Sequence, residues 1–221
     1  MKNNDNFETQ WLTKLQLGLE KINKSYLFND IRKFITETNL INWTQNLMAF
    51  LSENLSESEI KEVMISCACL TPKDNLKHIQ EEYTRTKDIQ HVHNLLQQQF
   101  ESFIRGYKKL DNEQIDFLRK NGWGMAGKLN GKVIYATKIP KEFHNYFSEK
   151  DKKKKQYYYC HCPRIRTSIL ENRLIDPKYC YCGAGFYKDI WEYILQKEVK
   201  IKILKSIMNG DDVCQIAVYL E

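Results

Sequence analysis

The chain has 221 residues, 42% of them hydrophobic, so it is long and apolar enough to bury a substantial core. Its net charge is +6, but much of the excess lies in the run from Lys150 to Lys155, which we interpret as a solvated loop rather than a nucleic-acid-binding face. The first residues lack the pattern of a signal peptide, and no apolar run approaches the roughly 18 residues of a membrane span. These features predict a cytoplasmic protein that binds neither nucleic acid nor membrane.

The N-terminal half shows apolar residues at helical spacing. Four helices are predicted there, with inward faces that include Leu12 and Leu19, Leu27 and Ile31, Trp43 and Leu47, and Ile60 and Val63. Ser56 followed by Glu59 is a capping-box signature that begins the fourth helix. A long helix is predicted from about Lys87 to Tyr107, and a shorter one follows a cap at Asp111.

After Gly122 the apolar pattern changes to that of strands. Asn130 and Gly131 predict a two-residue hairpin with a type I′ turn, and the residues from Val133 to Thr137 alternate as one strand. Tyr157 to Cys162 is a third strand candidate. Residues 183–196 predict a helix, and Val199 to Leu220 predict a closing antiparallel hairpin.

These elements predict an α+β protein in which a helical N-terminal layer packs on a small antiparallel sheet. The helical region covers residues 1–121, and residues 122–221 supply the sheet, the C-terminal helix and the β-hairpin. We expect the two regions to form one compact unit.

Two Cys-x-Cys pairs, Cys160 with Cys162 and Cys180 with Cys182, stand out in the C-terminal region. In a strand, residues two apart point the same way, so Cys160 and Cys162 would share one face while His161 occupies the other. Four thiolates are a ligand set of structural zinc, and the pairs predict a site for zinc or iron. An odd number of cysteines without an export signal favours reduced thiols over disulfides.

Two other interpretations of these cysteines stay open. They can be packed core thiols, because free cysteine is among the most buried residue types. Alternatively, Cys182 can be a nucleophile, because it directly precedes Gly183 at the predicted start of a helix, where free amides and the helix dipole favour a thiolate. His161 is then the candidate base, and Arg164 and Arg166 are candidates for binding a carboxylate.

The remaining cysteines are assigned away from this site. Cys214 aligns with Ile216 and Val218 in the last strand, so we predict that it belongs to the core. Cys67 and Cys69 follow a predicted helix, where residues two apart diverge, and their role stays open.

The segment CYCGAGFYKDIWEYILQKEVKIKILKSIMNGDDVCQIAVYL resembles the closing helix and hairpin of the 4-vinyl-reductase domain superfamily. With its CAC, YCHCPR and YCYCGAGFYK segments, the whole chain is similar to an uncharacterised bacterial family related to that group and to the L-2-amino-thiazoline-4-carboxylate hydrolase-like proteins. The resemblance implies a compact domain around a small-molecule pocket, often a sensor, or an enzyme that opens a sulfur-containing ring. Of the zinc ligands in some of those sensors only Cys214 is matched, since Ile203 and Ser206 occupy the other two positions.

The sequence therefore predicts a sensor-like protein that binds a small molecule near the Cys-x-Cys pairs. The predicted ligand-binding residues are His161, Arg164, Arg166 and Tyr187. The alternative is a thiol-dependent hydrolase that acts on a small sulfur- or nitrogen-containing compound through Cys182. Whether the chain forms a homodimer is left open.

Overall fold

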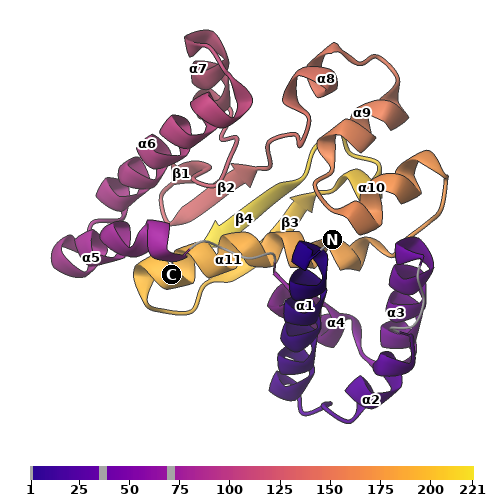
Figure 1. Ribbon diagram of the computed structural model, residues 1–221. Coiled ribbons are helices and arrows are strands. Elements are labelled where there is room, and N and C mark those ends of the chain that lie inside the picture. The colour runs from indigo at the N-terminus through magenta and orange to yellow at the C-terminus, as the bar shows by residue number, and fades with distance from the viewer. Residues whose placement is uncertain (1, 35–38, 69–72) are drawn as a thin grey trace.

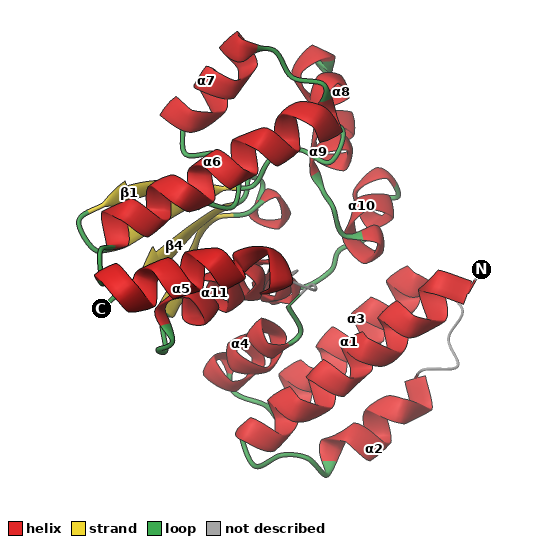
Figure 2. Ribbon diagram, turned by 60° about the vertical axis from the view of Figure 1, so that its left-hand side comes forward, coloured by secondary structure: helices red, strands yellow, loops and turns green. Residues whose placement is uncertain are grey.

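The computed structural model describes residues 2–34, 39–68 and 73–221. Its N-terminal helices are α1 (Lys2–Lys21), α2 (Leu27–Ile31), α3 (Leu40–Asn54) and α4 (Glu57–Ser66). Helices α1, α2 and α3 lie together on the side of the molecule away from the sheet, and α4 connects them to the rest (Figures 1 and 2). The capping box predicted at Ser56 and Glu59 is confirmed.

The next helices are α5 (Lys77–Thr86), α6 (Ile89–Lys108) and α7 (Asn112–Lys120). Helix α5 was not predicted from the sequence, whereas the predicted long helix corresponds to α6 and the shorter one to α7. Asp111 caps α7 by accepting a hydrogen bond from the backbone N–H of Gln114 at 2.8 Å.

Four antiparallel strands form one sheet with the order β1-β2-β4-β3. They are β1 (Lys128–Asn130), β2 (Val133–Thr137), β3 (Lys200–Lys205) and β4 (Gln215–Tyr219). Their register places apolar residues on one face, where Ile134 is paired with Val218 and Ala136 with Ile216. Helices α5, α6 and α11 (Tyr181–Leu195) pack with this face in one apolar core. The α+β class and the closing helix and hairpin are therefore confirmed.

The turn between β1 and β2 differs from the predicted type I′ turn. Asn130 is paired with Val133, so the two-residue loop consists of Gly131 and Lys132. Of these two residues only Gly131 has a positive φ, 58°, whereas a type I′ turn requires positive φ at both loop positions. The hairpin itself is as predicted, but its loop lies one residue later.

The end of a helix and a short extended segment replace the predicted strand at Tyr157 to Cys162, in a region of three short helices. They are α8 (Phe143–Ser148), α9 (Lys152–Tyr159) and α10 (Pro163–Leu170), which follow one another in the chain between β2 and α11 and lie together at one end of the sheet (Figure 1). Asp151 caps α9 by accepting a hydrogen bond from the Lys154 N–H at 2.8 Å, so the lysine run is the first part of a helix and not a loop. The predicted strand was wrong because the helix that begins at the capped lysines continues through Tyr157 and Tyr158 and ends at Tyr159. The Tyr159 side chain packs into the core from this helix.

A buried arginine ties α10 to the N-terminal helices. Arg164 is only 2% exposed, and its guanidinium carbon lies 4.7 Å from the ring centroids of both Trp11 and Trp43. The two indole rings also pack edge to face, with centroids 5.3 Å apart. Arginine stacks favourably on aromatic faces, so this cluster joins α1, α3 and α10. Among the described residues, none of the helices has both the length and the apolar character that a membrane crossing needs.

Helix α11 packs tightly against α4 at Gly185. A Cβ atom at this position would lie 2.2 Å from the carbonyl oxygen of Ile65 and 2.9 Å from the Cβ of Ala68, so only glycine allows the observed approach. In contrast, a Cβ at Gly106 in α6 would meet nothing within 4 Å.

We predict that Gly185→Ala lowers the free energy of unfolding by about 1–3 kcal/mol, because the added methyl group must push α4 and α11 apart. The matched control Gly106→Ala should be neutral or raise stability by up to about 1 kcal/mol, because alanine is the better helix former and the position is open. Urea unfolding of both variants measures the difference. Equal effects of the two substitutions would contradict the close packing of α4 and α11.

Candidate functional site

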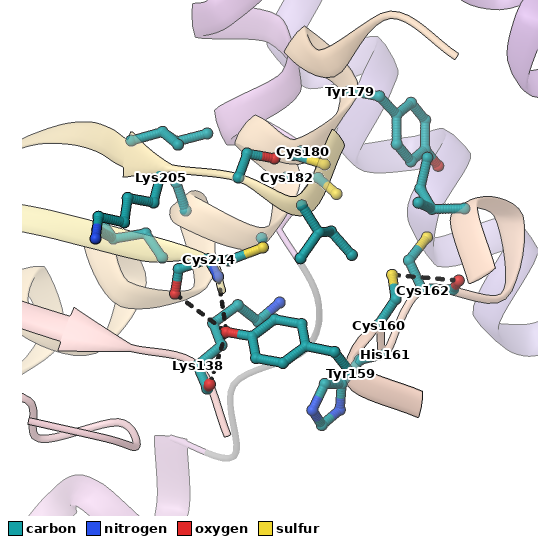
Figure 3. Close-up of a pocket in the computed structure, with 17 residues that line it drawn as sticks. Lys138, Tyr159, Cys160, His161, Cys162, Tyr179, Cys180, Cys182, Lys205 and Cys214 are labelled. Atoms are coloured by element: carbon teal, nitrogen blue, oxygen red, sulfur yellow. Dashed lines mark hydrogen bonds between the residues drawn. The ribbon is translucent and has the colours of Figure 1, made fainter. Parts of the chain in front are cut away.

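Five cysteines from three separate segments line one cavity, which we call the thiol cavity. Cys160 and Cys162 lie between α9 and α10, Cys180 and Cys182 lie at the start of α11, and Cys214 lies just before β4. Figure 3 shows their sulfur atoms approaching the cavity from different sides. The cavity has a volume of about 50 Å³, which exceeds the ~10–15 Å³ that one water molecule needs.

The first pair lies on an extended segment that belongs to no strand. Cys160 and Cys162 both have extended backbone angles, with φ/ψ of −71°/130° and −76°/118°. Successive side chains of an extended chain alternate in direction, so both sulfurs face the cavity and the His161 ring points the other way (Figure 3). The predicted alternation is thus present although the predicted strand is wrong.

The second pair lies where a 3₁₀ turn, η3 (Pro177–Cys180), runs directly into α11. Cys180 ends the turn with helical backbone angles, and the Tyr181 N–H already donates to backbone carbonyls of that turn. Cys182 is therefore not beside the free helix end that the sequence analysis expected. The sequence predicted free backbone N–H groups at the start of α11 that would stabilise a Cys182 thiolate. Because η3 runs directly into α11, the first of these N–H groups, that of Tyr181, is already hydrogen-bonded within the turn.

Cys214 was predicted to lie in the core away from this site, and this prediction was wrong. It precedes β4, is half-buried, and lines the thiol cavity. Ser206, which is 1% exposed, also lines the cavity, and its hydroxyl lowers the pKa of both Cys180 and Cys214 against the larger effect of burial. Strand alternation correctly placed Cys214 on the same side as Ile216, but both residues line the cavity, so that side is not closed core at this end of β4.

The Tyr159 hydroxyl fastens the walls of the cavity to one another. It donates a hydrogen bond to the Lys138 carbonyl oxygen at 2.7 Å and accepts one from the Cys214 N–H at 2.8 Å. Lys138 and Cys214 are also joined directly, because the Lys138 N–H donates to the Cys214 carbonyl oxygen at 3.0 Å. Through these bonds α9 is attached to the end of β2 and the beginning of β4.

Burial keeps three of the cavity thiols, those of Cys160, Cys180 and Cys214, in their protonated form. It raises the pKa of Cys180 to about 12, with a further rise from Cys214 that Ser206 opposes. Burial likewise raises the pKa of Cys160 well above its usual value, and that of Cys214 above its usual value. These three thiols are therefore neutral and must lose their protons before they can bind a metal ion or attack an electrophile.

Positive charge accompanies these thiols. Lys138 lines the cavity, and its Nζ lies so close to Gly183 that a Cβ there would be 3.1 Å away. Its charge favours the ionised forms of Cys160, Cys180 and Cys214, although burial outweighs it in each case. Desolvation, followed by the charge of Lys138, lowers the pKa of His161 to about 4, and the Nε2 of this ring lies 2.8 Å from the Ile139 carbonyl oxygen.

Three of the residues predicted to bind a ligand lie outside the cavity lining. Arg164 is in the tryptophan cluster, Arg166 forms an ion pair with Glu142, and Tyr187 is buried in the core against the sheet. Of that predicted set only His161 belongs to the cavity lining, and its ring points away from the cysteine sulfur atoms (Figure 3).

Lys138, Ser206 and Tyr159 line the cavity but were not predicted from the sequence. The residues next to them in the sequence form no motif that indicates a binding site. The position of Ser206 in the resemblance to the zinc-binding sensors was the one pointer, because Ile203, Ser206 and Cys214 all line the cavity.

The donor atoms do not form a metal centre as they stand. Among the described residues, no three Cys, His, Asp or Glu side chains are grouped closely enough to hold an ion. A tetrahedral zinc site needs four ligands, so zinc binding by the two pairs would require their side chains to move inward. Cys67 is buried at the end of α4 and does not line the cavity, and Cys69 lies outside the described residues.

Residues 130–221 match the model of a family described as a family of unknown function (DUF6144). The matched part contains all five cysteines of the thiol cavity together with Lys138, Tyr159 and Ser206. No curated protein and no solved structure matches the chain.

We predict that Tyr159→Phe lowers the free energy of unfolding by about 1–3 kcal/mol, because the Cys214 N–H and the Lys138 carbonyl lose a buried partner. Tyr158→Phe is the control, because that tyrosine is only half-buried and precedes Tyr159 on the same helix. Its effect should stay within about 0.5 kcal/mol. Chemical unfolding followed by tryptophan fluorescence measures both changes, and equal effects would contradict the fastening role of Tyr159.

The raised thiol pKa values also predict a loss of stability in alkali. A thiol whose folded pKa lies above its unfolded value of about 8.5 contributes stability that is complete below that value and is lost as pH rises through the folded value. For Cys180 this window runs upward to about 12. Between pH 8 and 10.5 the free energy of unfolding should therefore fall more steeply for the wild-type chain than for Cys180→Ala. Parallel slopes would show that Cys180 ionises normally in the folded protein.

Proposed function

We propose that this protein is a cytoplasmic, sensor-like binding protein that takes a small thiophilic ligand into the thiol cavity. The observation that supports this proposal is the convergence of five cysteine side chains from three segments on one enclosed space. Soft thiolate ligands select soft metal ions. A reducing compartment such as the cytosol keeps such thiols free of disulfides.

A buried hydroxyl at the cavity wall also supports a bound ligand. Tyr179 lines the cavity and is 1% exposed, and its hydroxyl has no hydrogen-bond partner among the described residues. An unsatisfied buried hydroxyl costs roughly 1–3 kcal/mol. A ligand or a water molecule in the cavity would supply the missing partner.

The geometry gives less support to the hydrolase alternative. Cys182 is 7% exposed and lies within the continuous run of η3 and α11. A nucleophilic cysteine needs a base within hydrogen-bond reach, and the proposed base His161 points away from the sulfur atoms (Figure 3). Its Nε2 is instead engaged with the Ile139 carbonyl oxygen at 2.8 Å.

The proposal predicts that at least one thiophilic probe stabilises the reduced protein. Zinc(II), copper(I) and a trivalent arsenical are tested separately by thermal unfolding under anaerobic conditions. A probe at about 100 times its Kd adds about 2.7 kcal/mol of stability, which raises the Tm of a chain of this size by about 5–10 °C. The same probe should slow alkylation of the cavity cysteines by iodoacetamide.

Matched variants locate the effect. The double variant Cys160→Ser and Cys180→Ser should lose the stabilisation, because it removes a thiol from each pair. Cys67→Ala should keep the stabilisation, because Cys67 does not line the cavity. If none of the three probes raises the Tm or protects any cavity cysteine, the protein does not bind thiophilic ligands there and the proposal is wrong.

A further inference from the structure

The face of the sheet that is turned away from α11 carries aromatic and basic side chains. Helices α5, α6 and α11 lie together on the other, apolar face (Figure 2). Because side chains alternate along a strand, this second face is formed by the residues between those of the core, such as Tyr135 between Ile134 and Ala136. We call it the outer sheet face and define it by Lys128, Tyr135, Lys200, Lys202 and Tyr219.

One row of the outer sheet face has a tyrosine between two lysines. Tyr135 on β2 is paired with Lys128 on β1 and with Ala217 on β4. Lys202 on β3 completes the row as the other partner of Ala217. Ala217 is buried because its methyl group lies below the level of its longer neighbours, whereas Lys128 and Lys202 are exposed and Tyr135 is 37% exposed.

The neighbouring row adds a second tyrosine and a third lysine. Tyr219 on β4 is paired with Lys200 on the edge strand β3, and Lys200 is exposed while Tyr219 is half-buried. Tyr219 lies two residues after Ala217, the partner of Tyr135, so the two tyrosines are diagonal neighbours on adjacent strands. Residues in this relation are about 7–8 Å apart. The aromatic rings therefore lie on the two central strands, with lysines on both edge strands.

The charge of the outer sheet face is of one sign. The four strands of the described sheet contain no Asp or Glu, and the nearest acids in the chain, Glu198 and Glu221, lie beyond the strand ends. A surface with this charge attracts polyanions, and lysines that neutralise phosphates release the counterions bound there.

The tyrosines favour one class of polyanion over the others. Unpaired bases stack on exposed aromatic rings, and sheet faces that carry such rings bind single strands in this way. The bases of a duplex are stacked on one another and cannot offer their faces to the rings. Elements that lie on membrane surfaces use Trp, Phe and Leu to enter the lipid, whereas both rings here are tyrosines.

We infer that the outer sheet face binds single-stranded nucleic acid, with the two tyrosines stacking on bases and the three lysines neutralising phosphates. The sequence predicted no such binding, because these residues lie on four different strands and become neighbours only through the register. The inference is independent of the proposed function. The thiol cavity contacts the opposite face of the same strands, through Ile203 and Ile216.

The test is fluorescence anisotropy of the full reduced chain with fluorescein-labelled oligouridylate and oligothymidylate of about 12 nucleotides. The wild-type protein should bind at least one of them with a Kd of about 1–100 μM at physiological salt. A duplex of the same length should bind about 10-fold more weakly, because it offers phosphates but no free base faces. The logarithm of the affinity should fall against the logarithm of salt concentration with a slope of about −2, which corresponds to three neutralised phosphates of a single strand.

Substitutions of Tyr135 test the stacking. Tyr135→Ala should weaken binding of the single strand by about 5- to 150-fold, the range found when a stacking ring is removed. Tyr135→Phe keeps the ring and should stay within about twofold of the wild type. Circular dichroism establishes that both variants are folded, and if the alanine variant unfolds, the lysine variants decide the outcome.

Two matched pairs of lysines test the location. Lys128→Gln with Lys202→Gln should reduce the magnitude of the salt slope by about 1.4, since each lost phosphate contact contributes about 0.7. Lys152→Gln with Lys154→Gln removes the same charge from exposed positions of α9 and should leave the slope unchanged. Equal effects of the two pairs would show that binding does not take place on the outer sheet face.

Three further outcomes would overturn the inference. They are absence of binding to both oligonucleotides at about 100 μM protein, a duplex bound as tightly as the single strand, and vesicles of phosphatidylserine bound in preference to either oligonucleotide. The double variant Cys160→Ser and Cys180→Ser should bind the oligonucleotides like the wild type. The thiophilic site and the outer sheet face therefore stand or fall separately.

Discussion

The hydroxyl of Tyr159 is the contact on which the arrangement of the site depends. It joins α9 to the Lys138 carbonyl oxygen at 2.7 Å and to the Cys214 N–H at 2.8 Å, so three segments distant in sequence meet at one atom. Cys160 follows Tyr159 directly, and its place is therefore fixed relative to the same two strand ends. A buried hydroxyl with both a donor and an acceptor partner is stable only when all three groups keep their positions.

The N-terminal helices contribute to the site from outside the cavity. Arg164 lies one residue after Pro163, the first residue of α10, and its guanidinium packs on Trp11 and Trp43 from α1 and α3. Trp11 also stacks on Tyr179, whose ring lines the cavity, with centroids 6.2 Å apart. The helical layer thus holds both Cys-x-Cys segments in place through aromatic and cation–π contacts rather than through cavity residues of its own.

Burial determines the chemistry available to the cysteines. Burial raises the pKa of Cys160, Cys180 and Cys214, so these three thiols are protonated in the resting cavity. Such thiols are protected from reaction with electrophiles, because the thiolate is the nucleophile. A metal ion that displaces the protons removes this constraint, since the ion supplies the positive charge that the apolar surroundings lack.

The sequence by itself determined the α+β class, the capped helices, the closing hairpin and the two cysteine pairs, because caps, apolar periodicity and turn residues act within a few neighbouring positions. The local sequence pattern did not determine the secondary structure of residues 157–162. The structure has the end of a capped helix followed by an extended segment there, in place of the predicted strand. Only the tertiary structure brought Lys138, Ser206 and Cys214 to the cavity and took Arg164 into the tryptophan cluster. These placements depend on strand register and on contacts between segments more than 50 residues apart, such as Tyr159 with Cys214, and such contacts leave no periodic signal in the chain.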